Sequence, residues 1–195
     1  MKDIARKIVQ QYTEFNDEEI DALLAFTTVE SFAKGDIVVA EGRICNKCYF
    51  VLQGCLRQFR IVDGLEKTSA FYVEQDPIVL YSSYMSAQPS ETSIQCMEDT
   101  LLLSGTKAQE AEMHKAYPAT GHLIYNLLSA DYRKAEAYIH LLNAYNPEQR
   151  YQALLQTKPG LLNRVPLVYI ASYIGVTPES LSRIRKRIVD NTRKA

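Results

Sequence analysis

The sequence predicts an α+β fold in three parts: an N-terminal β-roll, a long central helix and a C-terminal helix-turn-helix. Three observations predict it. Short β-rich runs separated by turn residues follow Phe32, helix formers without glycine or proline fill 122–144, and two short amphipathic helices around a glycine turn fill 167–186. We therefore expect the 195 residues to divide into 1–115, 116–146 and 147–195.

The first part opens with one short helix. Asn16 and Glu19 have the spacing of a capping box, in which each side chain bonds the backbone amide of the other residue. Apolar residues follow at Ile20, Leu23 and Leu24. This pattern predicts a helix that begins just after Asn16.

The β-rich region contains six predicted strands. Glycine-containing turns separate several of them, and the Asp63-Gly64 pair is the strongest local signal for a hairpin. Short strands at this spacing are typical of an all-β roll or barrel. The runs are 37–40, 49–52, 55–62, 68–73, 93–97 and 101–103.

The central helix carries two apolar stripes, and each stripe needs a surface to bury it. We expect one to pack on the β-roll and the other on the same helix of a second subunit, as a short parallel coiled coil. A single broad core face is the alternative. The candidate dimer stripe is Leu123, Leu127, Ala130, Ala137 and Leu141, and the neighbouring stripe includes Leu128, Ala135, Tyr138 and Leu142.

The helix-turn-helix begins with a short apolar stripe that ends at a glycine. Gly175 stands where a helix-ending residue must adopt a positive φ, which a residue without Cβ does at low cost. Small Ala171 suits a point where two helices cross closely. The stripe consists of Leu167, Ile170, Ala171 and Ile174.

The second helix has a recognisable start and two different faces. Thr177 can cap it, and Pro178 fits the first helical position, where no amide hydrogen is needed. The buried stripe is Leu181, Ile184 and Ile188, and the opposite face carries Glu179, Arg183, Lys186 and Arg187. Arg185 lies at the margin, where we expect a phosphate contact or an intramolecular role.

The polar face predicts contacts with DNA. Arg183 can donate to guanine O6 and N7, and Glu179 can accept from cytosine N4. A basic amphipathic helix that only caps a small bundle is the alternative. The candidate contacts with the DNA backbone are Thr177, Ser180, Ser182, Lys186 and Arg187.

Charge is distributed unevenly along the chain. Residues 147–195 hold nine Lys and Arg against three Asp and Glu, a net of +6, whereas 1–146 hold thirteen against twenty, a net of −7. A basic segment attached to an acidic body is typical of a nucleic-acid-binding protein.

Two regions resemble a known family. The segment 163–186, with T-P-E-S-L-S-R-I-R from Thr177 to Arg185, resembles the DNA-binding domain of the Crp/Fnr family of bacterial transcription factors, in which Glu179 and Arg183 occupy base-contacting positions. The motifs K-G-D-I, E-G and, from Phe50 to Leu56, F-V-L-Q-G-C-L resemble its cyclic-nucleotide-binding jelly roll, a double-stranded β-helix. Pro178 departs from the polar or basic residue of many members.

This resemblance implies several partners. They are a second copy of the chain, double-stranded DNA with a palindromic site, and RNA polymerase. The family also has a two-stranded wing after the second helix, but only a few residues follow that helix here.

The sequence also bears on localisation. Met1 to Val9 is too charged for a secretion signal, and no apolar run is long enough to span a membrane, so we expect a cytoplasmic protein.

The sensor part departs from the family at its ligand site. Residues 68–106 contain no Lys or Arg, and Pro89, Ser90 and Glu91 occupy the stretch where an arginine would hold the nucleotide phosphate. We therefore expect that cyclic AMP is not the effector and that a retained scaffold or an unknown small molecule replaces it. The candidate pocket residues are Tyr72, Tyr81, Tyr84, Ser90 and Glu91.

The remaining chemistry-bearing residues predict no catalytic, cofactor or metal site. Cys45 and Cys48 have C-x-x-C spacing, and Cys55 is a candidate third ligand, but reduced thiols are favoured over a metal site or a redox sensor. We expect a homodimeric DNA-binding regulator that is not an enzyme. The alternative is a ligand-sensing or protein-interaction β-roll module without a DNA-binding role.

Overall fold

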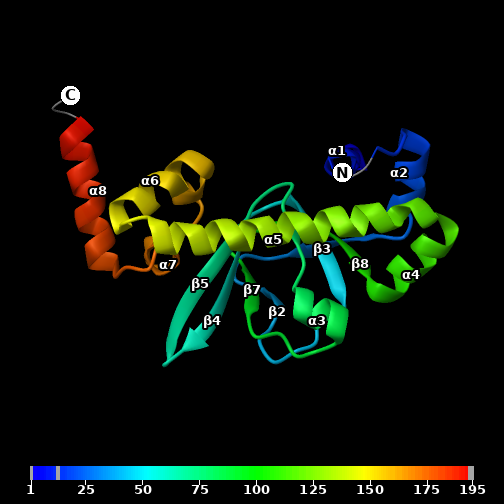
Figure 1. Ribbon diagram of the computed structural model, residues 1–195, viewed down its shortest axis with the longest axis horizontal. Helices are drawn as coiled ribbons and strands as arrows, with labels where there is room; N and C mark the ends of the chain where they lie inside the picture. The colour runs from blue at the N-terminus through cyan, green and yellow to red at the C-terminus, as the bar shows by residue number, and fades with distance from the viewer. Residues whose placement is uncertain (1, 12–13, 193–195) are drawn as a thin grey trace. The chain divides into compact units, whose positions relative to one another are not determined.

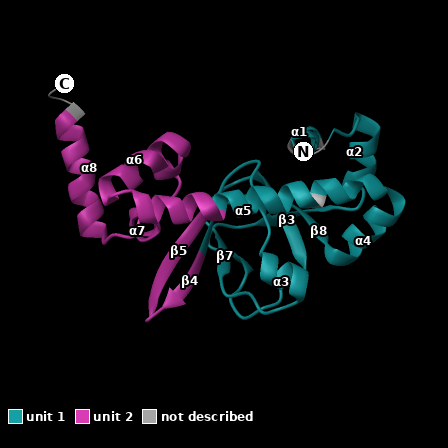
Figure 2. Cartoon of the chain, viewed as in Figure 1, with its two compact units in different colours: residues 1–58, 71–134 teal, residues 59–70, 135–195 magenta. Residues whose placement is uncertain are grey.

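The computed structural model describes residues 2–11 and 14–192 of the chain. These residues form two compact units, shown in teal and magenta in Figure 2. Unit 1 comprises 1–58 and 71–134, and unit 2 comprises 59–70 and 135–195. The three-part division of the sequence therefore stays a prediction, and each unit is described by itself.

The strands form a β-roll of two four-stranded sheets (Figure 1), and most of β4 and β5 in the second sheet is assigned to unit 2. The first sheet has the order β1-β8-β3-β6, with antiparallel neighbours, and consists of β1 (Thr28–Phe32), β8 (Thr100–Thr106), β3 (Lys47–Gln53) and β6 (Pro77–Ile78). The second has the order β2-β7-β4-β5 and consists of β2 (Ile37–Val39), β7 (Ser93–Cys96), β4 (Leu56–Val62) and β5 (Leu65–Tyr72). The predicted jelly-roll fold is confirmed.

The hairpin between β4 and β5 has the turn that its sequence predicts. Asp63 has φ 53° and Gly64 has φ 75°, so both central residues lie in the left-handed region that a type I′ turn requires. The strand ends around this turn, residues 59–70, belong to unit 2.

Helices cover the outside of the first sheet in unit 1. Asn16 and Glu19 form the predicted capping box at the start of α2 (Asp17–Leu24), with Glu19 N to Asn16 Oδ1 at 3.0 Å and Asn16 N to Glu19 Oε2 at 2.9 Å. Leu23 then packs in one core cluster with Leu103 of β8. The other helical elements are α1 (Lys2–Gln10), α3 (Tyr81–Ser86), α4 (Lys107–Ala116) and the 3₁₀ turn η1 (Pro118–Thr120).

The long helix α5 (Gly121–Ala144) has the predicted extent, but its first half is already covered within unit 1. Leu123 and Leu127 belong to the same core cluster as Leu23 and Met113, and Ala130 is also buried. These three side chains are therefore not available on a free face, which corrects their assignment to the subunit contact. The sequence pattern did not reveal that α2 and α4 would cover them.

Unit 2 contains the C-terminal helices. They are α6 (Pro147–Thr157), the 3₁₀ turn η2 (Leu161–Asn163), α7 (Leu167–Tyr173) and α8 (Pro178–Thr192). Its core contains Leu154, Leu161, Ile170 and Ile174, the last two from the predicted apolar stripe. Because α8 runs to Thr192, the described residues contain no strand after it, and none of the described helices is long and apolar enough to cross a membrane.

Candidate nucleic-acid interface

A glycine turn joins α7 to α8. The amide of Val176 donates to the carbonyl oxygen of Ala171 at 2.9 Å, and the amide of Gly175 donates to that of Ser172 at 3.1 Å. This pair of bonds is the Schellman motif, which needs a left-handed residue after the helix, and Gly175 has φ 74°. The turn thus satisfies the carbonyl groups at the end of α7 and directs the chain into α8.

The start of α8 is capped as the sequence predicts. Thr177 Oγ1 accepts a hydrogen bond from the amide of Ser180 at 3.2 Å, and Pro178 is the first helical residue. Ser182 Oγ donates to the carbonyl oxygen of Pro178 at 3.0 Å. The hydroxyls of Thr177, Ser180 and Ser182 are therefore grouped on the first turn, where backbone amides also favour an anion such as a phosphate.

The two faces of α8 differ in burial. Leu181 is 1% exposed and Ile184 is 6% exposed, and Ala171 of the contacting helix α7 is also buried. Glu179, Arg183, Lys186 and Arg187 are all exposed, whereas Arg185 and Ile188 are half-buried. The helix therefore has a buried apolar face and an exposed charged face.

The exposed face offers both acceptors and donors at its N-terminal end. The pKa of the Glu179 carboxyl is lowered, chiefly by a hydrogen bond from its own backbone amide and further by Thr177 and Arg183. Arg183 donates through one terminal nitrogen to Ser180 Oγ at 3.3 Å. Glu179 is thus a carboxylate acceptor at neutral pH, one helical turn from the Arg183 guanidinium.

Arg187 is engaged within unit 2. Its guanidinium forms an ion pair with the carboxylate of Glu148, in the first turn of α6. The side chain of Arg187 remains 59% exposed. A contact from Arg187 to a DNA phosphate would therefore share or replace the Glu148 partner.

Arg150 on α6 is a structural residue that the sequence reasoning missed. Its three nitrogens donate to three backbone carbonyl oxygens: Nε to Tyr145 at 2.8 Å, one terminal nitrogen to Ile174 at 3.0 Å and the other to Leu142 at 2.6 Å. These carbonyls lie at the end of α7, near the end of α5 and in the segment between α5 and α6. No sequence motif marks this side chain.

Strand β5 also contacts α7 within unit 2. Ser172 Oγ donates to the carbonyl oxygen of Glu66 at 3.0 Å and accepts from the amide of Thr68 at 3.0 Å. The Tyr138 hydroxyl lies 3.3 Å from the carbonyl oxygen of Thr68 and 3.2 Å from that of Tyr173, on whose ring the Tyr138 ring stacks. Strand β5 and α5 thus both contact α7, an arrangement that no local pattern indicated.

The five predicted pocket residues are not brought together. Tyr81 is 58% exposed and Glu91 is exposed, whereas Tyr72, Tyr84 and Ser90 are buried. The three buried hydroxyl groups donate to different acceptors: Tyr72 to Gln58 Oε1 at 2.8 Å, Ser90 to the carbonyl oxygen of Thr92 at 2.7 Å, and Tyr84 to the carboxylate of Glu110.

Two cationic side chains near the sensor strands were not predicted from the sequence to have a role, and only Arg57 of the two is fully buried. Arg57 of β4 is 1% exposed and donates from Nε and a terminal nitrogen to Gln95 Oε1, at 2.9 and 2.6 Å. Lys134 of α5 bonds Asp76 Oδ1 at 2.7 Å and lies 5.4 Å from the centre of the Tyr72 ring. Burial raises the pKa of nearby Asp131 to about 6, with Lys134 opposing and Asp76 reinforcing the shift.

The four cysteines are largely withdrawn from solvent. Cys45, Cys55 and Cys96 are buried, Cys48 is half-buried, and none of the four forms a disulfide. Burial raises the pKa of Cys48 to about 11, so this thiol is protonated at neutral pH and weakly nucleophilic. Within 2–11 and 14–192, no three His, Cys, Asp or Glu side chains are grouped as metal ligands.

Comparison with known proteins identifies the type of the N-terminal domain and the fold of the chain. Residues 29–117 match the model of the cyclic nucleotide-binding domain family. Among solved structures, FixK2 from Bradyrhizobium japonicum is 18% identical with a TM-score of 0.74, and the alignment covers 85% of this chain and 86% of that one. No curated protein matches this chain in sequence.

Two further structures have the same fold. The c-di-GMP-responsive global regulator CLP of Xanthomonas campestris is 14% identical with a TM-score of 0.71, over 91% of this chain and 93% of that one. The catabolite activator protein of Thermus thermophilus is 21% identical with a TM-score of 0.58, over 93% and 87%. The comparisons thus show a cyclic nucleotide-binding domain match over residues 29–117 and a fold shared with these regulators, as the sequence resemblance predicts.

Proposed function

We propose that this chain, which carries a cyclic nucleotide-binding-type domain in the fold of the Crp/Fnr regulators, is a sequence-specific DNA-binding regulator of transcription. The observation that carries the proposal is the two-faced helix α8. Its exposed Glu179, Arg183 and Lys186 lie opposite buried Leu181 and Ile184. A helix that only completed a bundle would need the buried face, but it would not need a group of side chains able to hydrogen-bond base edges.

Each exposed residue has a role that follows from its chemistry. Arg183 contacts a guanine edge, and Glu179 accepts from a cytosine amino group. Thr177, Ser180, Ser182, Lys186 and Arg187 bind the phosphates that flank those bases. The net charge of +6 in residues 147–195 supports this docking by attracting the DNA backbone.

We propose a homodimer formed through a stripe of α5 other than the one first assigned. Tyr125, Tyr132 and Ile139 are 69%, 69% and 59% exposed and recur every seven residues. Leu128 and Ala135 lie between them, so the spacing alternates between three and four, as in a coiled coil. An apolar heptad stripe on an exposed helix face supports burial against the same helix of a second copy.

The two-fold symmetry of the proposed dimer determines the symmetry and spacing of the DNA site. Two α8 helices related by a two-fold axis contact half-sites about one helical turn, ~34 Å, apart on the DNA. We therefore propose a palindromic site. As a DNA-binding regulator the protein acts in the cytoplasm, and RNA polymerase and a small effector are its further proposed partners.

We also propose that cyclic AMP is not the effector. Residues 68–106 contain no Lys or Arg that would hold the nucleotide phosphate. The buried Arg57 has the amide oxygen of Gln95 as an acceptor, and Tyr72 donates to Gln58. Both Arg57 and Tyr72 therefore already have protein partners.

Selection of bound sequences from random double-stranded DNA tests the proposed function. We expect a pair of inverted half-sites containing G·C pairs, with centres about one helical turn apart. Recovery of no enriched sequence at low salt would favour the alternative, a sensor module without a DNA-binding role. A variant with Arg183→Ala and Lys186→Ala provides the matched control, because both side chains are exposed and their loss leaves the core intact.

A further inference from the structure

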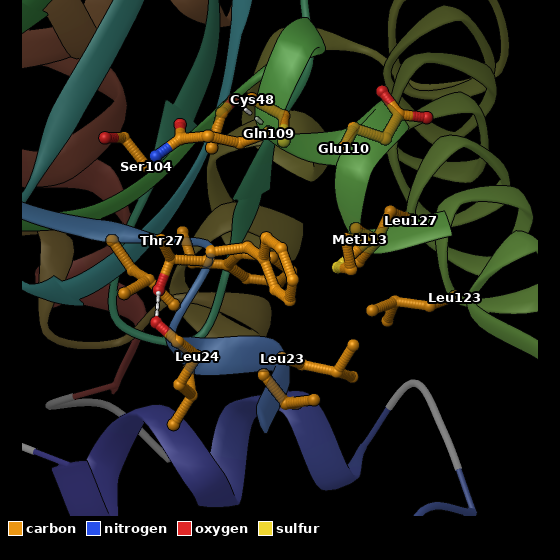
Figure 3. A pocket seen from close by; sticks show the side chains of 15 residues that line it. Leu23, Leu24, Thr27, Cys48, Ser104, Gln109, Glu110, Met113, Leu123 and Leu127 are labelled. Carbon is orange, nitrogen blue, oxygen red and sulfur yellow. Dashed lines mark hydrogen bonds between the residues drawn. The ribbon is translucent and has the colours of Figure 1, made fainter. Parts of the chain in front are cut away.

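An apolar cavity of about 60 Å³ lies in unit 1 between the first sheet and the helices that cover it. It is bounded by α2 and the segment after it, β3, β8, α4 and α5. Figure 3 shows the side chains of Leu23, Met113 and Leu123 directed toward this space. None of the five pocket residues expected from the sequence lines it.

The walls of the cavity have little to offer a water molecule. Thr27 Oγ1 donates to the carbonyl oxygen of Leu24 at 2.7 Å, Ser104 Oγ donates to the carboxylate of Glu30, and Cys48 Sγ donates to the carbonyl oxygen of Gly105 at 3.5 Å. A buried water needs two to four polar partners, and protein interiors are otherwise closely packed. The space therefore suits an apolar occupant better than water.

The charge at the cavity restricts that occupant further. Glu110 of α4 lines it, and its carboxylate accepts the Tyr84 hydroxyl. Among the described residues, no Lys, Arg or His lines the cavity. An anionic ligand such as a fatty acid would meet a carboxylate without a compensating cation, so the geometry favours an uncharged molecule.

The volume of the cavity limits the size of its ligand. Engineered apolar cavities of about 150 Å³ bind benzene or xenon. The cavity here is less than half as large, which leaves space for a xenon atom or a short alkyl group but not for a six-membered ring.

We propose that this cavity is a binding site for a small, uncharged, apolar ligand of the size of a short alkyl chain. Leu123 and Leu127 line it from α5, the helix that also carries the stripe Tyr125, Leu128 and Tyr132. A ligand there contacts the helix on the side opposite the proposed subunit contact. Any effect on dimerisation rests on the proposed function, whereas the binding itself does not.

Methyl NMR of the full-length protein, labelled at Leu and Val, tests the site with ethane, acetate and xenon as probes. We expect saturable shifts for ethane and xenon at Leu23, Leu103 and Leu123, and none for acetate. Shifts that rise linearly without saturation, or saturable binding of acetate equal to that of ethane, would overturn the proposal. DNA is absent, so this result is independent of the DNA-binding proposal.

Two variants locate the binding. Leu127→Phe fills the cavity and abolishes the saturable shifts, whereas the control Leu65→Phe, at a residue that is 61% exposed, leaves them unchanged. Leu123→Ala enlarges the cavity and confers benzene binding that the parent protein lacks. If the filling variant does not fold, Leu123→Ala decides: a failure of benzene to shift Leu23, Leu103 and Leu127 contradicts the assignment.

Discussion

The guanidinium of Arg150 donates a hydrogen bond to the carbonyl oxygen of Ile174 at 3.0 Å, at the point where α7 ends and the turn toward α8 begins. The same side chain bonds the carbonyl oxygens of Leu142 and Tyr145. One cation thus satisfies three carbonyl groups that no helical amide reaches. The position of the proposed DNA-binding helix depends on this contact.

Arg150→Met should destabilise unit 2. The methionine keeps most of the apolar stem but removes three hydrogen bonds from a charged donor, so we expect the free energy of unfolding to fall by about 2 kcal/mol or more. Denaturant unfolding measures the change. Arg133→Met, at an exposed position of α5, is the control and should change stability by less than about 0.5 kcal/mol. Equal stability of the two variants would contradict the role given to Arg150.

Tyr132→Glu should dissociate the proposed dimer. In a parallel pair of helices related by a two-fold axis, Tyr132 faces its own copy, so the substitution places two carboxylates together in an apolar contact. Sedimentation velocity is expected to show a shift to monomer. Arg133→Glu introduces the same side chain beside the stripe and should leave the dimer intact. Dissociation by both variants, or by neither, would count against this stripe.

Asp131→Asn should alter how stability depends on pH. The folded-state pKa of Asp131 is raised to about 6, so its protonated form stabilises the fold at low pH and that contribution is lost as pH rises through 6. The asparagine variant should therefore melt higher than the parent at pH 8 and show the smallest difference near pH 4. Burial is the main cause of the raised pKa and the charge of Asp76 reinforces it, so Asp76→Asn should lower the pKa of Asp131. A pH-independent difference in melting temperature would contradict the assignment.

Cyclic AMP should not stabilise the protein. A ligand present at about 100 times its dissociation constant stabilises the folded state by about 2.7 kcal/mol, which raises the melting temperature measurably. We expect no shift with about 1 mM cyclic AMP or cyclic GMP. A concentration-dependent rise would show that the roll binds the nucleotide without a Lys or Arg from residues 68–106.

Local patterns predicted the parts of the fold whose causes are local. The capping box at Asn16, the Asp63-Gly64 turn and the positive φ of Gly175 follow from neighbouring residues alone, and all three are confirmed. The strands β1 and β6 were missed. β6 has only two residues and includes Pro77, and β1 is recognisable chiefly through its pairing with distant β8.

Long-range contacts explain the remaining differences. Leu123 and Leu127 repeat at helical spacing, but which surface covers them depends on α2 and α4, far away in sequence. The guanidinium of Arg150 donates hydrogen bonds to carbonyl oxygens of three separate segments. Thr68 of β5 donates to Ser172, which lies 104 residues away in sequence. The inward and outward faces of α8 were predictable because helix periodicity alone defines them.

The central claim is that α8 recognises bases through Arg183, and competition binding of Arg183→Ala tests it most directly. The selected DNA site and a site with one G·C pair of each half replaced are compared for the parent protein, for Arg183→Ala and for Lys186→Ala at several salt concentrations. Arg183→Ala should remove about 1–3 kcal/mol of discrimination between the two sites, whereas Lys186→Ala should weaken both equally and reduce the salt dependence. If Arg183→Ala instead weakens both sites equally and leaves their ratio unchanged, Arg183 does not recognise bases and the account is contradicted.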